Sequence, residues 1–377
     1  MCGSGGLNIN TMQNYPKIAI IYLSYHSEQY IEDVVFALKN LDYPKEKLEF
    51  VIVDNLHPDY GSSLRFLEET IMPLSGADIP RATILPQSEN LGFAGGNNAG
   101  IAWALKNGFD YVYLHNDDGF MAQNALKPIV EVMQEDKNIA VAQSLLLLHP
   151  DTEYLNNAGN SFHYLGFGFC DKYREKFKEV KLSSVQEISY ASGAACLLRA
   201  DLLKQYGMLD EDFFLYHEDL ELCFRFRSLG YKIALVSNSI FYHKYKFSRS
   251  IEKFYYMERN RYGVMLMFFR WPTLVLLFPM MLVLELGLWL FAWRGGWLDK
   301  KVKVYKYWFE KDNWKLWLSK RKRIQEMRKV TDRFLFKYTV PNIMFQEKGM
   351  NSPLLKYVGN PLMTLYYWVV VKGLIWW

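Results

Sequence analysis

Apolar residues alternate between continuous runs and helix-like spacing over the first part of the chain. Residues 18–23 and 50–53 are unbroken apolar runs, typical of strands that are buried on both faces. Between them, residues 28–40 carry apolar side chains at helical spacing. The alternation continues through predicted elements at 61–71, 83–85, 96–107 and 111–114. It predicts an α/β fold with a mainly parallel central sheet, whose ligands bind at the carboxyl ends of the strands.

The next part of the chain has a mixed pattern. It predicts helices at 123–135, 200–206 and 218–229 and strands at 139–143, 195–198 and 232–236. Residues 150–190 are rich in glycine and aromatic residues and show no clear period. We interpret this stretch as a mobile loop that binds the acceptor or covers the site.

The pattern changes after residue 262. Residues 271–293 are almost wholly apolar, interrupted by Pro279 and Glu285, and 363–377 form a second apolar run. The segment 294–350 between them is dense in bases, including Lys300, Lys301, Lys303, Lys320, Arg321, Lys322 and Arg323.

Length alone allows residues 271–293 to cross a bilayer, because a span needs roughly 20 apolar residues. A basic connecting segment, however, is expected to stay on the cytoplasmic side, like the domain before it. A single span would place that segment on the opposite side. We therefore expect a re-entrant hairpin bent near Pro279, or interfacial helices with their bases towards anionic headgroups. The alternative is a soluble helical tail packed on the core or on a partner subunit.

Composition and charge exclude some classes of protein and indicate the compartment. The net charge is only +4, which argues against a general nucleic-acid binder. The four cysteines lack metal-ligand spacing and are expected to be thiols in a reducing compartment. Residues 1–14 contain no apolar stretch of the secretory kind, so we expect a cytoplasmic catalytic domain. The predicted organisation is a disordered segment at 1–16, a catalytic domain at 17–262 and a membrane-associating helical tail at 263–377.

A glycine-rich segment, residues 89–100, surrounds the start of one predicted helix. Glycine lets a backbone approach a phosphate or nucleoside closely, and a helix start supplies free amides. Such a turn is as often purely structural, because glycine readily adopts positive φ. The spacing matches neither the dinucleotide fingerprint GxGxxG nor the phosphate loop GxxxxGK[ST].

Two acidic clusters lie about a hundred residues apart. Asn116, Asp117 and Asp118 follow an apolar strand, where oxygen ligands suit Mg²⁺ or Mn²⁺ held together with substrate phosphates. A polar turn is the alternative. Glu218 and Asp219 open a predicted helix, where an acid is either a helix cap or a base for an acceptor hydroxyl.

Two further expectations concern the protonation of these groups. His243 follows the last predicted strand; a lone histidine is more often structural, but a neutral imidazole here can complete a metal site with Asp118. At a helix N-terminus, Asp219 is expected to have a lowered pKa. A lowered pKa makes it a poorer base until bound acceptor shields it from water.

In their order along the chain, these motifs resemble those of family 2 glycosyltransferases, and most of all the rhamnosyltransferase and galactofuranosyltransferase branch. The resemblance runs from about residue 17 to 262. It rests on Val53-Asp54-Asn55, Asn90 to Asn97, Asn116-Asp117-Asp118, Ser192-Gly193-Ala194, Glu218 to Leu222 with Gly230-Tyr231, and His243. It implies a GT-A fold and an inverting, metal-dependent transfer of a sugar.

The resemblance also implies roles for single residues. Asp219 is the expected catalytic base and Glu218 its neighbour at the acceptor. Asp118, His243 and Asn116 are the expected ligands of Mg²⁺ or Mn²⁺. The expected donor-binding residues are Ser24, Asp54, Asn90, Gly92, Gly96, Asn97, Asn98, Asn116, Asp117 and Gly193.

Some positions depart from the family pattern. Asn116 stands where the DxD-like motif begins and is a weaker ligand than Asp. Asp117 stands at the middle position, so the metal ligand is either Asp117 or Asp118. The QxxRW motif of processive synthases is missing after Asp219, which argues against a polymerase.

Residues 259–261 (Arg-Asn-Arg) match an RN-type motif and are expected to face the diphosphate or the membrane.

The leading hypothesis is an inverting glycosyltransferase at the cytoplasmic face of the cell membrane, bound peripherally or re-entrant. It moves rhamnose or a similar sugar from a TDP- or UDP-sugar to a lipid-linked or cell-surface glycan. Expected partners are the nucleotide-sugar donor, a glycan or polyprenyl-linked acceptor, the membrane surface and a second copy of the chain, but no nucleic acid.

Three alternatives stay open beside this hypothesis. A membrane-tethered, inactive transferase-like scaffold predicts loss of Asp118, Asp219 or His243, and all three are present. A nucleotidyltransferase predicts a glycine- and base-rich loop after the first strand, which residues 24–27 do not supply. A nucleic-acid binder that uses the basic segment predicts binding without nucleotide-sugar or metal.

Overall fold

A mainly parallel sheet forms the centre of the computed structural model, which describes residues 15–245, 254–344 and 353–377. The 10-stranded sheet has the order β10-β12-β6-β11-β4-β1-β2-β3, with β5 paired to β12 and β7 to β6. Its strands are β1 (Ile18–Ser24), β2 (Leu48–Asp54), β3 (Arg81–Pro86), β4 (Tyr111–His115), β5 (Gly119–Met121), β6 (Ile139–Leu148), β7 (Leu155–Asn157), β10 (Val185–Glu187), β11 (Ala195–Arg199) and β12 (Lys232–His243). The disorder expected for residues 1–16 falls, for 1–14, outside the described residues.

The pairing of the strands follows the predicted class. Strands β1 to β4 pair in parallel, as do β6 and β12, while β11 lies antiparallel between β4 and β6. Every residue of β1 and β2 is buried, as expected for strands covered by helices on both faces. The predicted α/β fold with a mainly parallel sheet is confirmed.

Helices cover the sheet and form most of the described part of the tail. Those of the sheet domain are α1 (Ile31–Asn40), α2 (Leu64–Ile71), α3 (Gly92–Lys106), α4 (Leu126–Glu135), α5 (Ala200–Tyr206) and α6 (Glu218–Ser228). Those that follow are α8 (Phe254–Phe268), α9 (Trp271–Gly295), α10 (Leu298–Phe309), α11 (Lys311–Met327), α12 (Asp332–Leu335) and α13 (Asn360–Tyr366). The expected domain boundary at residue 262 lies inside α8.

The glycine-rich segment is itself helical, because α3 begins at Gly92, four residues earlier than its pattern indicates. Its glycines allow close packing on the sheet. A Cβ added at Gly96 would lie 2.4 Å from Leu23, and one added at Gly100 would lie 2.5 Å from Ile21. The glycines therefore let the helix approach β1, a role that needs no ligand.

The segment at 150–190 is tied down by small strands. It contains β7, β10 and the strands β8 (Asn160–His163) and β9 (Gly168–Cys170), which pair with each other. Strand β8 also pairs in parallel with β13 (Thr339–Val340) from the tail. The expected mobile loop is thus a pair of short ladders that joins the sheet domain to the tail.

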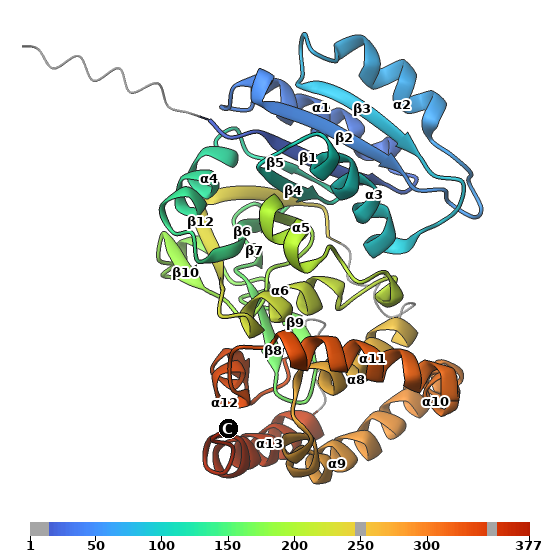
Figure 1. The fold of residues 1–377 in the computed structure, drawn as a ribbon, viewed down its shortest axis with the longest axis vertical. Helices are drawn as coiled ribbons and strands as arrows, with labels where there is room; N and C mark the ends of the chain where they lie inside the picture. Colours follow the sequence, from blue (N-terminus) through green and yellow to red (C-terminus); the bar gives the residue numbers. More distant parts are fainter. Residues whose placement is uncertain (1–14, 246–253, 345–352) are drawn as a thin grey trace, which may run out of the picture.

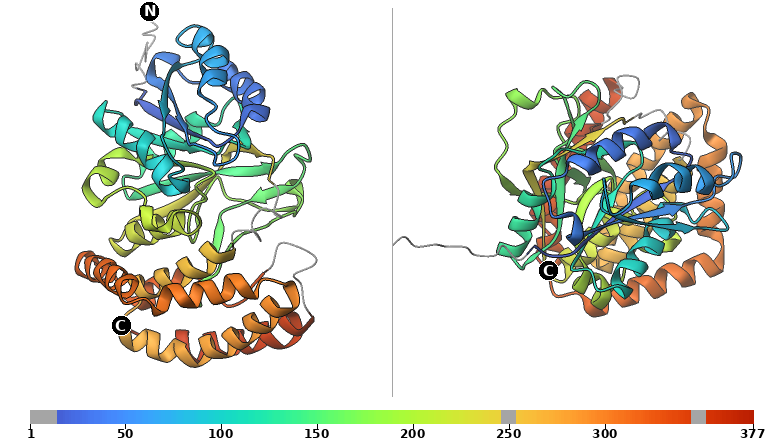
Figure 2. Two further views of the ribbon diagram at one scale, coloured as in Figure 1. Left: turned by 90° about the vertical axis from the view of Figure 1, so that its right-hand side faces the viewer. Right: turned by 90° about the horizontal axis from the view of Figure 1, so that it is seen from above.

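The tail lies beneath the sheet domain in two layers, with α8, α10 and α11 above and α9 and α13 below (Figures 1 and 2). Helix α9 continues through Pro279, so the hairpin expected to bend there is wrong. The chain turns instead at Gly296, which has φ +76°. Within the described residues, α9 is the one helix that is long and apolar enough to cross a membrane.

Candidate active site

The first acidic cluster meets His243 at the carboxyl end of β4. Asp118 Oδ1 lies 2.8 Å from His243 Nε2, and Asn116 Nδ2 donates to the same carboxylate oxygen. Strand β12 extends to His243, several residues beyond its predicted end, and its pairing with β5 sets His243 opposite Gly119. The structure thus brings together Asn116, Asp118 and His243, and it is Asp118 rather than Asp117 that faces the imidazole.

A residue that the sequence did not single out orients His243. Asn156, on β7, is buried, and its Oδ1 lies 2.9 Å from His243 Nδ1. An Nδ1–H that donates to this oxygen would leave the lone pair of Nε2 free to coordinate a bound cation. An outer hydrogen bond of this kind fixes the tautomer of a metal-binding histidine.

The residues present fit a small divalent cation. A carboxylate oxygen of Asp118, the side-chain amide of Asn116 and an imidazole nitrogen of His243 converge; with the amide turned so that its oxygen faces the site, the three side chains suit Mg²⁺ or Mn²⁺. The described residues contain no group of three or more His, Cys, Asp or Glu side chains that could hold a metal ion alone. The set fits a cation whose remaining ligands come from substrate phosphates and water.

The second acidic cluster opens α6. Asp219 Oδ2 accepts from the Gly193 amide at 3.1 Å, and Oδ1 accepts from the Leu220 amide at 2.7 Å. Glu218 is buried beside it, and its Oε2 has no hydrogen-bond partner among the described residues. Asp219 keeps a partial opening to solvent. One carboxylate is therefore presented to a ligand and the other is enclosed.

Burial changes the protonation of both acids. It raises the pKa of Asp219 to about 6, although the amides of Gly193 and Leu220 act in the opposite direction. Burial, and then the charge of Asp219, raise the pKa of Glu218 well above its usual range. The expectation of a lowered pKa for Asp219 is wrong, because loss of water outweighs the helix N-terminus. With a pKa of about 6, Asp219 is mostly charged at neutral pH and is a stronger base than an exposed carboxylate.

The two clusters are joined by one short segment. Gly193 donates to Asp219, and the carbonyl of the next residue, Ala194, accepts from the Asn116 amide at 2.9 Å. A Cβ added at Gly193 would lie 2.9 Å from the Phe93 ring and 3.6 Å from Asp219 Cβ. The backbone at Gly193 therefore sits between the metal-type cluster and the base.

The loop before Glu218 has an unusual backbone. Phe214, Tyr216 and His217 have φ of 60°, 65° and 68°, values that side chains with a Cβ adopt at a cost. Asn260 Nδ2 donates to the carbonyls of Phe213, Leu215 and Tyr216 at 3.0, 3.0 and 2.7 Å. Strained backbone of this kind is concentrated at functional sites, and here it aims the start of α6.

The RN-type motif at residues 259–261 also binds the backbone just before this loop. Arg259 donates to the carbonyls of Asp212 and Phe213 at 2.6 and 2.8 Å, while Arg261 is buried against Glu258. All three residues of the motif are buried. The expectation that residues 259–261 face the diphosphate or the membrane is therefore wrong.

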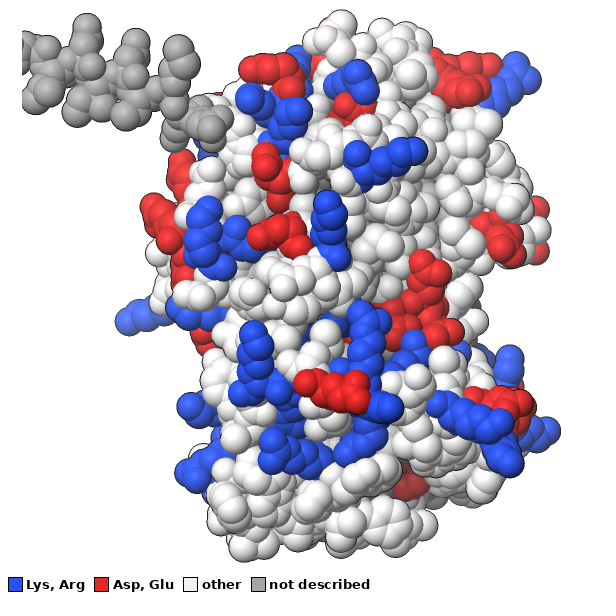
Figure 3. Space-filling model, in the orientation of Figure 1, with Lys and Arg blue, Asp and Glu red and all other residues white. Residues whose placement is uncertain are grey.

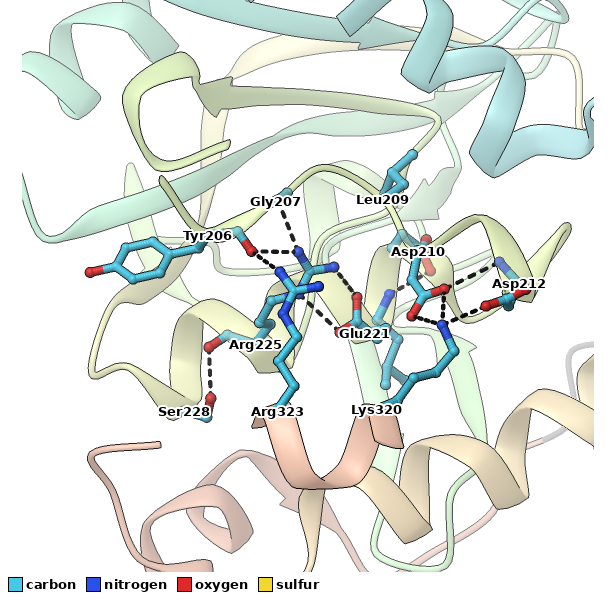
Figure 4. Close-up of polar contacts among 12 residues, drawn as sticks. Tyr206, Gly207, Leu209, Asp210, Asp212, Glu221, Arg225, Ser228, Lys320 and Arg323 are labelled. Carbon is cyan, nitrogen blue, oxygen red and sulfur yellow. Dashed lines mark hydrogen bonds and ion pairs between the residues drawn. The ribbon is translucent and has the colours of Figure 1, made fainter. Parts of the chain in front are cut away.

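Helix α11 contacts the segment that precedes this loop, residues 206–212 (Figure 4). Lys320 Nζ lies 2.6 Å from both Asp210 carboxylate oxygens and 2.7 Å from Asp212 Oδ2. Arg323 donates to the Tyr206 carbonyl at 3.0 Å (Figure 4). Some bases of the segment 294–350 thus bind other parts of the protein, contrary to the expectation that the whole segment faces headgroups; these are Lys301, Lys320 and Arg321.

The predicted donor-binding residues divide into two groups. Ser24, Asp54 and Asn90 lie at the carboxyl ends of β1, β2 and β3, at the expected edge of the sheet. Asp54 is buried and accepts from Ser62 Oγ and from the Ser63 amide, so it orders the following turn. Asn90 accepts from the Gly92 amide at 2.9 Å.

The second group of predicted donor-binding residues packs against or hydrogen-bonds to other parts of the protein. The amides of Phe93 and Ala94 at the start of α3 donate to the Phe214 carbonyl, so they are not offered to a phosphate. Asn97 Nδ2 donates to the Phe93 carbonyl, and Asn98 bonds Leu209 through both side-chain atoms. Gly92, Gly96, Asn97 and Asn98 therefore shape the site through packing and hydrogen bonds within the chain.

An aromatic group beside Asp54 was not predicted. The rings of His26 and Tyr60 stack with centroids 4.1 Å apart, and Tyr25 lies 4.5 Å from His57. Tyr60 is 66% exposed, so its face is open to a planar ligand. These residues occur in loops without periodicity; Tyr25 and His26, directly after the first predicted strand, were the only signal.

Comparison with known proteins agrees with this geometry. The sheet with two acidic clusters at its carboxyl edge has the GT-A fold of glycosyltransferases. It is similar to the crystal structure of GalNAc-T7 with UDP, GalNAc and Mn²⁺, with a TM-score of 0.52 over 67% of this chain and 48% of that one, at 12% identity. The model of the family described as "Glycosyltransferase like family 2" matches residues 16–263, so the chain belongs to this family.

Two curated relatives match part of the chain in sequence. The low-salt glycan biosynthesis hexosyltransferase Agl10 of Haloferax volcanii is 24% identical, covering 56% of this chain and 61% of the relative. The probable glycosyltransferase YdaM of Bacillus subtilis is 22% identical, covering 61% of this chain and 51% of the relative. The chain thus matches little more than half the length of each relative.

Proposed function

We propose that the protein is an inverting, metal-dependent glycosyltransferase. It moves a hexose, rhamnose or a similar sugar, from a TDP- or UDP-sugar to a hydroxyl group of a glycan. The observation that carries this proposal is the juxtaposition of two unlike carboxylate sites: a base with a raised pKa at Asp219 and the Asp118–His243 pair, joined through Gly193 and Ala194. Membership of the family supports it.

In this reaction Asp219 takes the proton of the acceptor hydroxyl. That oxygen forms a bond to the anomeric carbon as the bond to the nucleoside diphosphate breaks on the opposite face, which inverts the centre. Asp118, His243 and Asn116 would hold Mg²⁺ or Mn²⁺, which supplies positive charge next to the leaving diphosphate. Asp54 and the aromatic group at Tyr60 would line the nucleotide side.

The raised pKa of Glu218 favours its neutral form, which keeps a second negative charge away from Asp219. Were both acids ionised, repulsion would favour protonation of Asp219 at neutral pH. The strained loop at 214–217, held by Asn260, fixes the direction of Asp219 before any acceptor arrives. Preorganisation of this kind lowers the cost of reaching the reactive geometry.

We further propose that the acceptor is lipid-linked or part of a cell-surface glycan, and that the enzyme acts at the cytoplasmic face of the cell membrane. The apolar helix α9 and the bases of α10 and α11 support this location.

Release of nucleotide from a panel of TDP-, UDP- and GDP-sugars tests the proposal. Each donor is supplied with Mn²⁺, with Mg²⁺ or with EDTA. We expect release from one class of donor, dependent on the metal. Donor binding without turnover, in the presence of extracted lipid-linked and free glycan acceptors, would favour the inactive scaffold. Binding of nucleic acid without nucleotide-sugar or metal would overturn the proposal.

A further inference from the structure

The two lowest helical segments of the molecule expose a continuous set of apolar side chains. Helix α9 and the helical residues 353–372 lie side by side along the base of the molecule (Figures 1 and 2). Tyr366 donates to the Leu276 carbonyl and Trp377 donates to Thr273 Oγ1, so the two segments are joined. The exposed apolar side chains of this basal face are Val275, Phe278, Leu282, Val283, Leu286, Leu290 and Trp293, with Tyr357, Val358, Leu362, Leu365, Trp368, Val369 and Trp376.

Such exposure is not that of a soluble core helix. Only 17% of the most apolar window of α9 is buried, and Leu286 is 67% exposed. The exposed residues recur three or four positions apart, so they share one side of the helix. Contiguous apolar patches of this extent mark interaction sites.

One flank of α9 is bound to the protein by charge. Glu285, the acid that interrupts the apolar run, pairs with Arg261 of α8 at 3.3 Å and with Lys301 of α10. Tyr305 donates to its Oε1 at 2.6 Å. Lys301 is fully buried and also pairs with Glu258 at 2.7 Å.

This cluster stays charged inside the tail. Although burial alone would raise it, Arg261 and Lys301 lower the pKa of Glu258 to about 2. Removal of Glu285 from the cluster would leave Lys301 with one fewer buried partner, which is costly. The start of α9 is fixed as well, because Thr273 Oγ1 donates to buried Asp332. Helix α9 is therefore attached along its length to the layer above it.

Exposed bases lie on the layer directly above the basal face (Figure 3). In the view of Figure 3 the lowest part of the molecule is almost free of charged atoms, and a band rich in Lys and Arg lies over it. The exposed bases of the described tail are Arg270, Arg294, Lys303, Lys306, Lys311, Lys315, Lys322, Arg323, Lys329, Arg333, Lys337 and Lys356. The exposed acids there are Asp299, Glu310, Asp312 and Glu326.

We propose that the basal face docks on a lipid bilayer with anionic headgroups, with α9 and the helical residues 353–372 lying in the plane of the interface. The apolar side chains enter the outer acyl region, and the bases above meet the headgroups. Helix α9 is about 37 Å long at about 1.5 Å per residue, enough for a span. It does not span, because a crossing would pull Glu285 into hydrocarbon away from Arg261 and Lys301.

Vesicle flotation of the full chain tests the docking. The probes are vesicles of phosphatidylcholine alone and mixed with phosphatidylglycerol. The double variant Leu282→Glu/Leu286→Glu is expected to bind at least about tenfold more weakly to both, since it removes apolar burial. Phe36→Glu, an equally exposed apolar residue on α1, is the matched control and is expected to bind like the wild type.

Two further variants complete the set. Trp368→Glu/Val369→Glu changes the neighbouring segment and is expected to act like the α9 variant, so a folding failure of one pair leaves the other as a test. Lys303→Glu/Lys306→Glu is expected to weaken binding only to the anionic vesicles, by about fivefold per charge. Lys106→Glu on α3, also an exposed base, is its control.

Spin labels distinguish the flat orientation from a span. Labels are attached to cysteines introduced at Val275, Leu282 and Leu290, in a background with Cys2 and Cys170 replaced by serine. Equal depths in the bilayer are expected at all three positions. A depth profile that passes through the bilayer centre would overturn the flat arrangement. Failure to bind either vesicle, together with a dimer that the Leu282→Glu/Leu286→Glu variant dissociates, would assign the face to a second copy of the chain.

Discussion

The two acidic clusters occupy neighbouring positions at one edge of the sheet, but their surroundings differ. Asp118 faces an imidazole and a side-chain amide, so its contacts are those of a metal ligand. Asp219 accepts from backbone amides and lies beside buried Glu218, whose pKa burial raises well above its usual range. In the reaction that we propose, the same carboxylate group serves cation binding in one place and proton transfer in the other. The difference lies in desolvation and in the neighbouring groups rather than in the residue type.

The sharpest way to break this comparison is Asp219→Asn. The amide keeps the size of the side chain but cannot accept a proton, so kcat is expected to fall by about 10²–10⁴. Nucleotide release and donor binding are measured together, and donor binding is expected to be unchanged. Glu131→Gln, at an exposed acid on α4, serves as control. Undiminished turnover in Asp219→Asn would remove the base from this position.

The proposed metal site at Asp118 and His243 is tested by the substitution Asn156→Ala. His243 Nδ1 then loses its acceptor, and the affinity for Mn²⁺ is expected to fall by about 10–100-fold. Calorimetric titration of Mn²⁺ in the presence of the nucleoside diphosphate measures this effect without turnover. The pH dependence of activity is expected to stay as in the wild type. A change in that profile with unaltered Mn²⁺ affinity would contradict the assignment.

The proton-transfer side is tested by pH. Because Asp219 acts as a base only when it is deprotonated, kcat/KM is expected to rise about tenfold per pH unit up to about pH 6 and then level off. The initial rate of nucleotide release at low donor concentration gives this profile. The residual activity of Asp219→Asn is expected to lack this rise. A profile that is level through the region around pH 6 would disprove the raised pKa.

The smallest effect is expected at the joint between the clusters. Gly193→Ala places a Cβ 2.9 Å from the Phe93 ring, so either the ring or the backbone must shift. Overpacking of this kind costs about 1–3 kcal/mol, and kcat is expected to fall severalfold as Asp219 moves with Gly193. Thermal unfolding and kcat are measured side by side. Gly287→Ala, where no atom lies within 4 Å, is the control.

The fold was largely predictable from the pattern, because buried parallel strands are continuous apolar runs whose ends are marked by polar residues. The two acidic clusters were visible for the same reason. Which of Asp117 and Asp118 faces His243 was not, because that contact joins residues 125 positions apart through the unpredicted extension of β12.

The burial of the acids and the long-range contacts of the site could not be predicted from the sequence. The pKa of Asp219 depends on how much protein surrounds it, and the helix rule that predicts a lowered value ignores that protein. The roles of Asn156, Arg259 and Asn260 arise from contacts with distant backbone and have no local signal. The glycines of α3 suggested a ligand, but their closest neighbours are Leu23 and Ile21.

Helix α8 has a consequence for how the molecule could be re-engineered. One end of its RN-type motif holds the backbone before Glu218, and the other pairs with Glu285 of α9. The lower helices are therefore not a detachable anchor. A chimera that exchanges them for another protein's membrane tether would remove a partner of Arg261, one residue from the clamp at Asn260. Such a chimera would keep the hydrogen bonds of Asn260 to the loop but would weaken the buried ion-pair cluster next to it.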